Sequence, residues 1–304
     1  MPSIQARILN VIVRVLIKRR NWGRDEDAFV KRARRLFGAP VVWRWLSVRG
    51  MTVDQHSSGG ISGEWVSVKK PETDAIILYI HGGGYVSCSP VTHRPVAAAL
   101  ARLTRLRVFG IDYRLAPEHR FPAAADDVFA AYKYLREQYP GTPIAVAGDS
   151  AGGGLTLALM QKLEDENIGL PACGVCFSPW TDMTVSGDSM SENEEKDRMF
   201  YRSTIKSFAA AYLGTADPVN KYASPLFGEF SGMPPILFQV SSTEVLADDS
   251  RRIHEQIQSC GGTSELHIYD GVFHSWQMAA GLLPEADAAM KNAAEFIRRH
   301  TKLS

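Results

Sequence analysis

One segment of the chain reads Ile144-Ala145-Val146-Ala147-Gly148-Asp149-Ser150-Ala151-Gly152. Its first four residues are apolar and predict a buried strand, and a helical pattern covers residues 152–167 after it. Between them lies a G-x-S-x-G pattern, which between a strand and a helix is typical of a nucleophile elbow. The glycines remove side chains that would clash in a strained turn, so the serine hydroxyl is exposed at the strand end. Ser150 is therefore the candidate nucleophile.

The rest of the chain repeats this alternation of strand and helix. Predicted strands lie at Ala75–Ile80, Leu106–Tyr113, Ile144–Ala147, Gly174–Phe177, Ile236–Val240 and Glu265–Tyr269, and two half-exposed strands precede them at Val48–Val53 and Ile61–Val68. Predicted helices fill residues 92–104, 123–138, 152–167, 245–259 and 285–300, with a short helix near Ser203–Leu213. Such repetition predicts an α/β fold with a mostly parallel sheet, helices on both faces and ligands at the carboxyl ends of the strands.

A second glycine-rich segment, His81-Gly82-Gly83-Gly84-Tyr85, directly follows the predicted strand Ala75–Ile80. Consecutive glycines let backbone N–H groups approach an oxyanion without obstruction, which acyl transfer requires. The alternatives are a plain glycine turn and a phosphate-binding loop, but neither G-x-G-x-x-G nor a Gly-Lys-Ser/Thr loop occurs here. Together with Ser150, the segment predicts an oxyanion-binding loop.

The general base must be a histidine that a carboxylate orients. Of the eight histidines, His274 follows the last predicted strand, in the position that the chain order serine, acid, histidine requires. The acid should come from the loop after the strand Ile236–Val240, which offers Glu244, Asp248 and Asp249. Glu244 comes first after the strand and is the preferred candidate, while the two aspartates are expected to cap or decorate the next helix.

These motifs together resemble the bacterial hormone-sensitive-lipase family of esterases. The resemblance runs from the Val48 strand to His274 and is carried by His81-Gly82-Gly83-Gly84, Tyr113-Arg114-Leu115-Ala116-Pro117-Glu118, Phe121-Pro122-Ala123, Gly148-Asp149-Ser150-Ala151-Gly152 and Ser178-Pro179-Trp180. It implies an α/β-hydrolase fold with a mostly parallel eight-stranded sheet, flanking helices and a helical cap. By the same resemblance, the amides of Gly83, Gly84 and Ala151 hold the oxyanion. Residues 1–45 and 182–227 are expected to form the cap over an acyl pocket, and residues 46–181 and 228–304 the catalytic domain.

The chain departs from the family at the acid. The family usually carries Asp-Pro-Leu-x-Asp, whereas this chain has Glu244-Val245-Leu246-Ala247-Asp248, so a glutamate takes the position of the catalytic aspartate. A glutamate is one methylene longer and still accepts the imidazole N–H if the backbone recedes, and glutamate triads are known in this fold. Ser150, His274 and Glu244 are thus the predicted triad, with Asp248 as the alternative acid.

Composition favours an ordinary globular protein with one main domain. The 304 residues are 45% apolar with a formal charge of +1, which gives no reason to expect a nucleic-acid partner. Cys173 and Cys176 form a single CxxC in an apolar run and are expected in a buried strand, and no cysteine has histidine partners at zinc-site spacing. Neither a metal nor an organic cofactor is predicted.

The N-terminal residues up to Lys18 predict an amphipathic basic helix, with Arg7, Asn10, Arg14 and Lys18 together on its polar face. Arg14 interrupts the apolar region that a signal peptide requires, so we expect neither secretion nor a membrane span. We expect a cytoplasmic location instead. We expect this helix to lie over the protein's own apolar surface, with contact to a bilayer as the alternative. A second helix is expected to begin after a capping Asp25 and to end at Gly38.

The predicted function is hydrolysis of short-chain acyl esters of small molecules through an acyl-enzyme, as the resemblance implies. Because the neutral imidazole is the base, activity should rise with pH through roughly 6.5. Amidase or lactonase activity uses the same constellation, and a non-catalytic small-molecule receptor of this fold, in which the histidine is lost, is a further alternative. A membrane-surface lipase that uses the N-terminal helix is a third, and homodimerisation is an expectation from the relatives.

Overall fold

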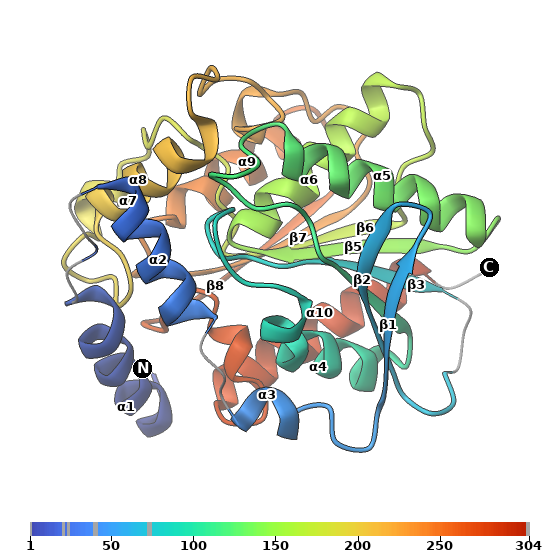
Figure 1. The fold of residues 1–304 in the computed structure, drawn as a ribbon, viewed down its shortest axis with the longest axis horizontal. Coiled ribbons are helices and arrows are strands. Elements are labelled where there is room, and N and C mark those ends of the chain that lie inside the picture. Colours follow the sequence, from blue (N-terminus) through green and yellow to red (C-terminus); the bar gives the residue numbers. More distant parts are fainter. Residues whose placement is uncertain (1, 20–21, 23–24, 39–41, 72–74, 302–304) are drawn as a thin grey trace.

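The computed structural model describes residues 2–19, 22, 25–38, 42–71 and 75–301 (Figure 1). Within these residues, eight strands form one sheet in the order β1-β2-β4-β3-β5-β6-β7-β8. Both pairs made by β2 are antiparallel, and the strands from β4 to β8 pair in parallel. The prediction of a mostly parallel eight-stranded sheet is therefore confirmed. The strands are β1 (Thr52–Ser58), β2 (Ile61–Ser67), β3 (Ile76–Ile80), β4 (Arg107–Ile111), β5 (Ile144–Asp149), β6 (Cys173–Phe177), β7 (Ile236–Ser241) and β8 (Ser264–Tyr269).

Helices cover both faces of this sheet, above and below it in Figure 1. Along β3, Ile76, Leu78 and Ile80 belong to the core cluster that includes residues of α5, α6 and α9, whereas Ile77 and Tyr79 belong to the cluster that includes residues of α4 and α10. All five side chains are buried, because a parallel strand in the middle of a sheet meets helices on both sides. The helices of these two layers are α4 (Arg94–Thr104), α5 (Ala123–Gln138), α6 (Ala151–Asp165), α9 (Ala247–Ser259) and α10 (Pro284–Thr301).

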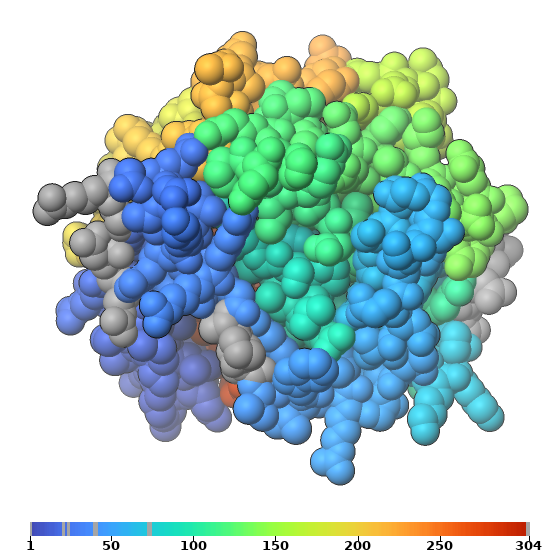
Figure 2. Space-filling view, viewed as in Figure 1, coloured from blue at the N-terminus to red at the C-terminus, as the bar shows by residue number. Residues whose placement is uncertain are grey.

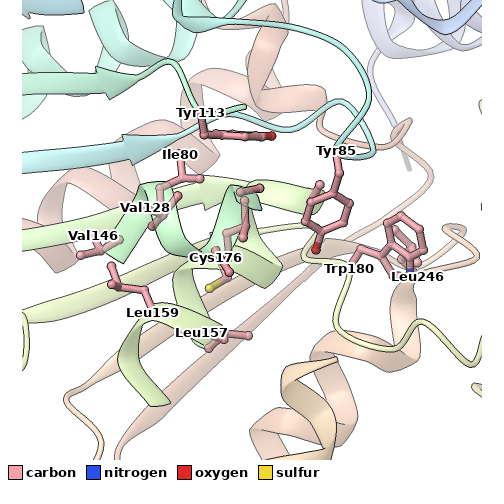
Figure 3. Close-up of a cluster of buried hydrophobic side chains, with 14 of the residues drawn as sticks. Ile80, Tyr85, Tyr113, Val128, Val146, Leu157, Leu159, Cys176, Trp180 and Leu246 are labelled. Carbon is pink, nitrogen blue, oxygen red and sulfur yellow. The ribbon is translucent and has the colours of Figure 1, made fainter. Parts of the chain in front are cut away.

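The larger core cluster fills the space between the sheet, α5 and α6 (Figure 3). Val128 of α5 and Leu159 of α6 meet Val146 of β5 there, and the Cys176 sulfur points into the same cluster. Cys173 and Cys176 are both buried in β6 as free thiols, so the prediction that they are strand residues is confirmed. Burial raises the pKa of the Cys173 thiol to about 12, which keeps it protonated and unreactive.

The first predicted strand is wrong in position. The structure has a turn at residues 48–51 and places β1 at Thr52–Ser58, where the prediction had Val48–Val53. The reason is a two-residue hairpin at Gly59-Gly60, which pairs Ser58 with Ile61 and fixes β1 opposite β2. The apolar residues near Val48 indicated a strand, but the turn at Gly59-Gly60 determines which residues of β1 pair with β2.

The N-terminal segment is helical as expected, but its orientation differs from the prediction. It consists of α1 (Ile4–Val13) and a π-helix, η1 (Arg14–Lys18). Leu9, Val13 and Ile17 pack against the core cluster as expected. Asn10 and Lys18, however, are also turned inward and buried. The correction has a physical cause: Asn10 and Lys18 donate hydrogen bonds to the backbone oxygens of Gly271 and Asp197, so they need not face water.

Two further N-terminal helices follow, α2 (Glu26–Phe37) and α3 (Val42–Leu46). The Asp25 side chain accepts a hydrogen bond from the Ala28 amide at 2.8 Å, which confirms it as the N-cap of α2. Gly38 follows the last residue of α2, as predicted. In Figure 2 the blue atoms of α2 cover part of the left side of the visible face, and α3 lies at its lower edge. None of the described helices is long and apolar enough to cross a bilayer.

Residues 182–227 hold α7 (Ser189–Glu192), α8 (Arg202–Leu213) and a short 3-10 helix, η3 (Pro225–Phe227). This segment meets the N-terminal helices directly. The Phe29 ring of α2 lies edge-on to the Phe208 ring of α8, with centroids 4.6 Å apart. Lys18 Nζ donates to the backbone oxygen of Asp197 at 2.9 Å. Segments nearly 180 residues apart in the chain are therefore packed together. Two more 3-10 helices, η2 (Pro90–His93) and η4 (Trp276–Ala279), flank the sheet.

Candidate active site

Ser150 lies in a sharp turn between β5 and α6. Its backbone has φ 52° and ψ −121°, a conformation that side-chain-bearing residues rarely adopt. Two hydrogen bonds hold it there, from the Ser150 amide to the Phe177 oxygen at 2.8 Å and from the Trp180 amide to the Ser150 oxygen at 2.9 Å. A Cβ at Gly152 would lie 2.0 Å from the Ile80 oxygen, so only glycine permits this close approach of α6 to β3. The turn has the geometry of a nucleophile elbow.

His274 and Glu244 come together from the loops after β8 and β7. Nδ1 of His274 lies 2.6 Å from Oε2 of Glu244, within strong hydrogen-bond distance, and both side chains are buried. The other carboxylate oxygen, Oε1, accepts hydrogen bonds from the Ser178 hydroxyl at 2.7 Å and the Ser241 amide at 2.8 Å. With three donors on its two oxygens, the carboxylate is held in one orientation against the imidazole.

The ring nitrogen of His274 on the other side, Nε2, is buried and has no hydrogen-bond partner among the described residues. Nδ1 carries the proton that Glu244 accepts, so Nε2 of the neutral ring has a free lone pair. His274 and Ser150 line the same pocket. The imidazole is therefore prepared to accept a proton within that pocket.

Glu244 also changes the proton affinity of His274. Burial alone would lower the pKa of the imidazole, because a low-dielectric environment disfavours its charged form. The negative charge and the hydrogen bond of Glu244, with smaller contributions from Asp197 and Asp149, outweigh burial, so the pKa of His274 is raised above 6.5. Activity was predicted to rise with pH through roughly 6.5, the ordinary pKa of histidine. Because the pKa of His274 is raised, we expect that rise at a higher pH.

The alternative acid, Asp248, lies elsewhere. Its Oδ2 accepts a hydrogen bond from the Ser189 amide at 2.7 Å, and its Oδ1 pairs with Arg251 at 3.0 Å. Asp249 accepts from the Thr181 amide at 2.6 Å. Both aspartates lie in the first turn of α9, where Asp249 connects that helix to the loop after β6 and Asp248 connects it to α7.

The glycine loop after β3 reaches the same pocket. Gly83 and Gly84 line it and have φ values of 109° and 62°. At Gly84 a Cβ would lie 2.4 Å from the Phe208 ring, so the position has no room for a side chain. Within the described chain, the amides of Gly83, Gly84 and Ala151 donate to no protein acceptor. Three unused N–H donors at the carboxyl ends of β3 and β5 are suited to an oxyanion.

A buried network behind Ser150 was not predicted from the sequence. Oδ1 of Asp149 accepts hydrogen bonds from the Tyr79 hydroxyl at 2.7 Å and from the Gly82 amide at 2.9 Å, and lies 3.3 Å from Nε2 of His93. Burial by itself would raise the pKa of this carboxyl, but His93 and the hydrogen bonds hold it below its ordinary value. Asp149 thus joins the nucleophile elbow to the glycine loop. In the sequence, the only indication of a role for Asp149 is its position next to Ser150 in the G-x-S-x-G motif.

Ser178 is the other residue without a predicted role. It belongs to the Ser178-Pro179-Trp180 motif, yet its contact with Glu244 spans 66 residues of chain and leaves no pattern in the sequence. The structure brings them together because β6 and β7 are neighbours in the sheet and both loops emerge at the same edge.

The pocket at this edge is apolar and small. Its cavity volume is about 200 Å³. Besides Ser150, His274 and the two glycines, it is lined mainly by apolar side chains from α1, η1, α2, α8 and the loops between strands: Val13, Ile17, Leu36, Phe37, Trp180, Met199, Phe200, Ile205, Phe208, Leu246, Phe273 and Met278. The Phe200 ring lies edge-on to the His274 ring with centroids 5.2 Å apart. No three His, Cys, Asp or Glu side chains gather at a metal-binding geometry in the described residues.

The comparisons with known proteins agree with this geometry. A model of the family described as alpha/beta hydrolase fold matches residues 77–278. An acetyl-hydrolase from Streptomyces hygroscopicus is 37% identical over 249 residues, which are 82% of this chain and 83% of the relative. A crystal structure of an esterase from the bacterial hormone-sensitive lipase family matches with a TM-score of 0.90 at 34% identity, covering 99% of this chain and 100% of that chain. The crystal structure of EstE5 soaked with p-nitrophenyl butyrate matches with a TM-score of 0.85 at 35% identity, covering 98% and 99%.

The fold and these relatives define the class: the protein is a carboxylic ester hydrolase built on the α/β-hydrolase fold. Within that class, the chain belongs to the bacterial hormone-sensitive-lipase family.

Proposed function

We propose that the protein hydrolyses short-chain acyl esters through a triad of Ser150, His274 and Glu244. The observation that carries the triad is the 2.6 Å contact between His274 Nδ1 and Glu244 Oε2, combined with the strained Ser150 turn on the same pocket. The hydrogen bonds of the Asp248 carboxylate with Ser189 and Arg251 support the choice of Glu244 over Asp248.

In the proposed reaction the Ser150 hydroxyl attacks the ester carbonyl while Nε2 of His274 takes its proton. The carbonyl oxygen becomes an oxyanion, which the amides of Gly83, Gly84 and Ala151 stabilise as hydrogen-bond donors. The imidazolium then gives its proton to the departing alcohol, and Glu244 stabilises that imidazolium until it does. Water repeats the sequence on the acyl-enzyme, which releases the acid and restores Ser150.

The size of the pocket supports a preference for short acyl chains. Its volume of about 200 Å³ lies below the range of about 300–1,000 Å³ that is usual for drug-sized ligands. The wall is mostly apolar, so it suits the hydrocarbon part of a small acyl group. The relative named acetyl-hydrolase acts, by its name, on the acetyl group, which has two carbons.

We also propose that residues 1–45 and 182–227 form a cap on a catalytic domain of residues 46–181 and 228–304. The contacts of Phe29 with Phe208 and of Lys18 with Asp197 support this division. Side chains of both segments, including Phe37 and Phe200, line the pocket over Ser150. The cap thereby excludes water from part of the site and shapes the acyl pocket.

The test is a series of p-nitrophenyl esters from acetate to palmitate, measured with the wild type and three variants. We expect the highest kcat/KM on the short chains. We expect Ser150→Ala to lower turnover by about 10⁴-fold to 10⁶-fold and Glu244→Gln to lower it strongly. Asp248→Asn is the matched control, since it removes a neighbouring carboxylate with the same chemistry. Near-normal turnover in Ser150→Ala, or loss in Asp248→Asn with survival of Glu244→Gln, would overturn the assignment.

Amides and lactones of the same acyl size provide the second arm of this experiment, because the same residues attack any acyl carbonyl. We expect the ester to have the highest kcat/KM. A higher kcat/KM on the amide or the lactone would retain the triad and change the substrate class.

A further inference from the structure

The N-terminal helices expose an unusual amount of apolar surface. Nine of the fifteen large hydrophobic side chains that are exposed in the described residues belong to α1, η1 and α3. On α1 and η1 they are 43 to 73% exposed, and they recur at the spacing of one helical face: Ile4, Ile8, Val11, Ile12, Val15 and Leu16. On α3 they are Val42, Trp45 and Leu46. In Figure 1, α1 lies at the left and α3 at the lower edge of the molecule.

The exposure is held in place by the polar residues on the opposite face. Asn10 Nδ2 donates to the Gly271 oxygen at 2.7 Å, and Lys18 Nζ donates to the Asp197 oxygen at 2.9 Å. Asn10 is 6% exposed and Lys18 is 1% exposed. Turning the helix over to bury its apolar face would break both contacts and would leave Asn10 and Lys18 without these backbone partners. The outward apolar face is thus a fixed feature of the fold.

The charge of the same segment is strongly one-sided. Residues 1–50 contain twelve of the 34 Lys and Arg but three of the 33 Asp and Glu, a formal charge of +9 against −8 for the remaining chain. The first acidic residue is Asp25. Arg19, Arg35 and Arg49 are exposed, and none of them forms an ion pair with another described residue. A face with exposed apolar side chains and basic surroundings is complementary to an anionic lipid surface.

We propose that α1, η1 and α3 dock the protein on the surface of an anionic phospholipid bilayer. The apolar side chains enter the boundary between headgroups and acyl chains, Trp45 lies at the level of the headgroups, and the basic residues meet the lipid phosphates. Val13 and Ile17 on the inner side of the same helices line the active-site pocket, so docking brings that pocket close to the bilayer. The proposal concerns binding and does not depend on the esterase reaction.

The test is sedimentation of the full-length protein with vesicles. We expect it to sediment with vesicles of phosphatidylcholine mixed with phosphatidylglycerol, and much less with phosphatidylcholine alone or at high salt. The double variant Ile8→Glu/Ile12→Glu places two acids on the exposed face and should weaken binding by about tenfold or more. Its matched control is Val219→Glu/Ile268→Glu, which changes two equally exposed apolar residues elsewhere, each 47% exposed in the wild type, and should bind as the wild type does.

Turnover of dissolved p-nitrophenyl acetate is measured alongside and should be equal in all three proteins, because neither pair of residues lines the pocket. Wild-type protein that stays in solution with anionic vesicles overturns the proposal. The proposal is also overturned if the Ile8→Glu/Ile12→Glu variant binds the anionic vesicles as strongly as the wild type does. A wild-type dimer that this variant dissociates, without vesicle binding, would identify the face as a contact between two copies of the chain instead.

Discussion

The substitution Glu244→Gln replaces the buried carboxylate that contacts His274 with an amide of nearly the same shape. In the wild type, Oε2 accepts the His274 Nδ1 proton at 2.6 Å, while Oε1 is held by Ser178 and Ser241. The amide oxygen of glutamine can keep the second set of contacts, which directs its NH₂ group at Nδ1. A donor then faces a donor, so the imidazole turns or adopts the wrong tautomer, and the charge that stabilises imidazolium is gone. An amide in place of the triad acid costs about 10⁴-fold in kcat in well-studied serine hydrolases, about 5.4 kcal/mol of activation free energy.

The pH profile gives a second, independent readout of the same change. Among the groups that raise the pKa of His274 against the opposing effect of burial, Glu244 has the largest effect, ahead of Asp197 and Asp149. Without the charge of Glu244, the pKa of His274 falls. Because the neutral imidazole is the base, the acid limb of the residual activity should move to lower pH than in the wild type, where its midpoint lies above 6.5.

The assay is kcat and kcat/KM on p-nitrophenyl acetate from pH 5 to 9, with Asp248→Asn as the control and Glu244→Asp as the length variant. Shortening the side chain by one methylene withdraws the carboxylate from Nδ1, and a displacement of about 1 Å can cost about 10²-fold. We therefore expect activity in the order wild type and Asp248→Asn, then Glu244→Asp, then Glu244→Gln. Equal activity of Glu244→Gln and wild type, with unchanged pH profiles, would refute the assignment of the acid.

Three further variants test the surroundings of the site. Ser178→Ala removes a hydrogen bond to buried Glu244 and should lower the free energy of unfolding by about 1.5–3 kcal/mol in urea titrations; an unchanged midpoint would show that the bond contributes nothing. Gly84→Ala forces a Cβ to 2.4 Å from the Phe208 ring at a φ of 62°, so kcat should fall by about 10²-fold while circular dichroism stays native. Burial raises the pKa of Asp249 to about 7, so the native state keeps a proton that the unfolded chain loses near pH 4. The contribution of this group to stability should therefore be lost as pH rises from 4 to 7. Asp249→Asn lacks this group and should give a flatter curve of unfolding free energy against pH; parallel curves would contradict the shift.

Much of the sheet could be predicted because its strands are marked locally. The apolar runs at Ile144 and Ile236 lie in β5 and β7, and the helical pattern at residues 123–138 coincides with α5. Burial on both faces requires continuous apolar residues, and such a run is visible in the sequence alone. β1 was misplaced because it is half-exposed and its register depends on a turn, which apolar content does not report.

Motifs also located the candidate site residues, since the elbow at Ser150 and the glycine loop at Gly83 and Gly84 need particular residue types at fixed spacing. The chain order brought His274 and Glu244 into consideration, but left Asp248 as an alternative. Only the tertiary structure separates these two acids, because one turn of helix decides which carboxylate reaches Nδ1.

Local patterns in the sequence are sufficient to predict the α/β sheet, the turn at Ser150, the glycine loop and the residues able to complete a triad. Contacts between residues far apart in the chain become visible only in the folded structure. Asp149 finds Tyr79 and His93, Glu244 finds Ser178, and Asn10 finds the Gly271 carbonyl and turns the apolar face of α1 outward. The physical reason is that a buried polar group takes its orientation from whichever donor or acceptor the fold brings to it, and that partner leaves no periodic trace in the sequence.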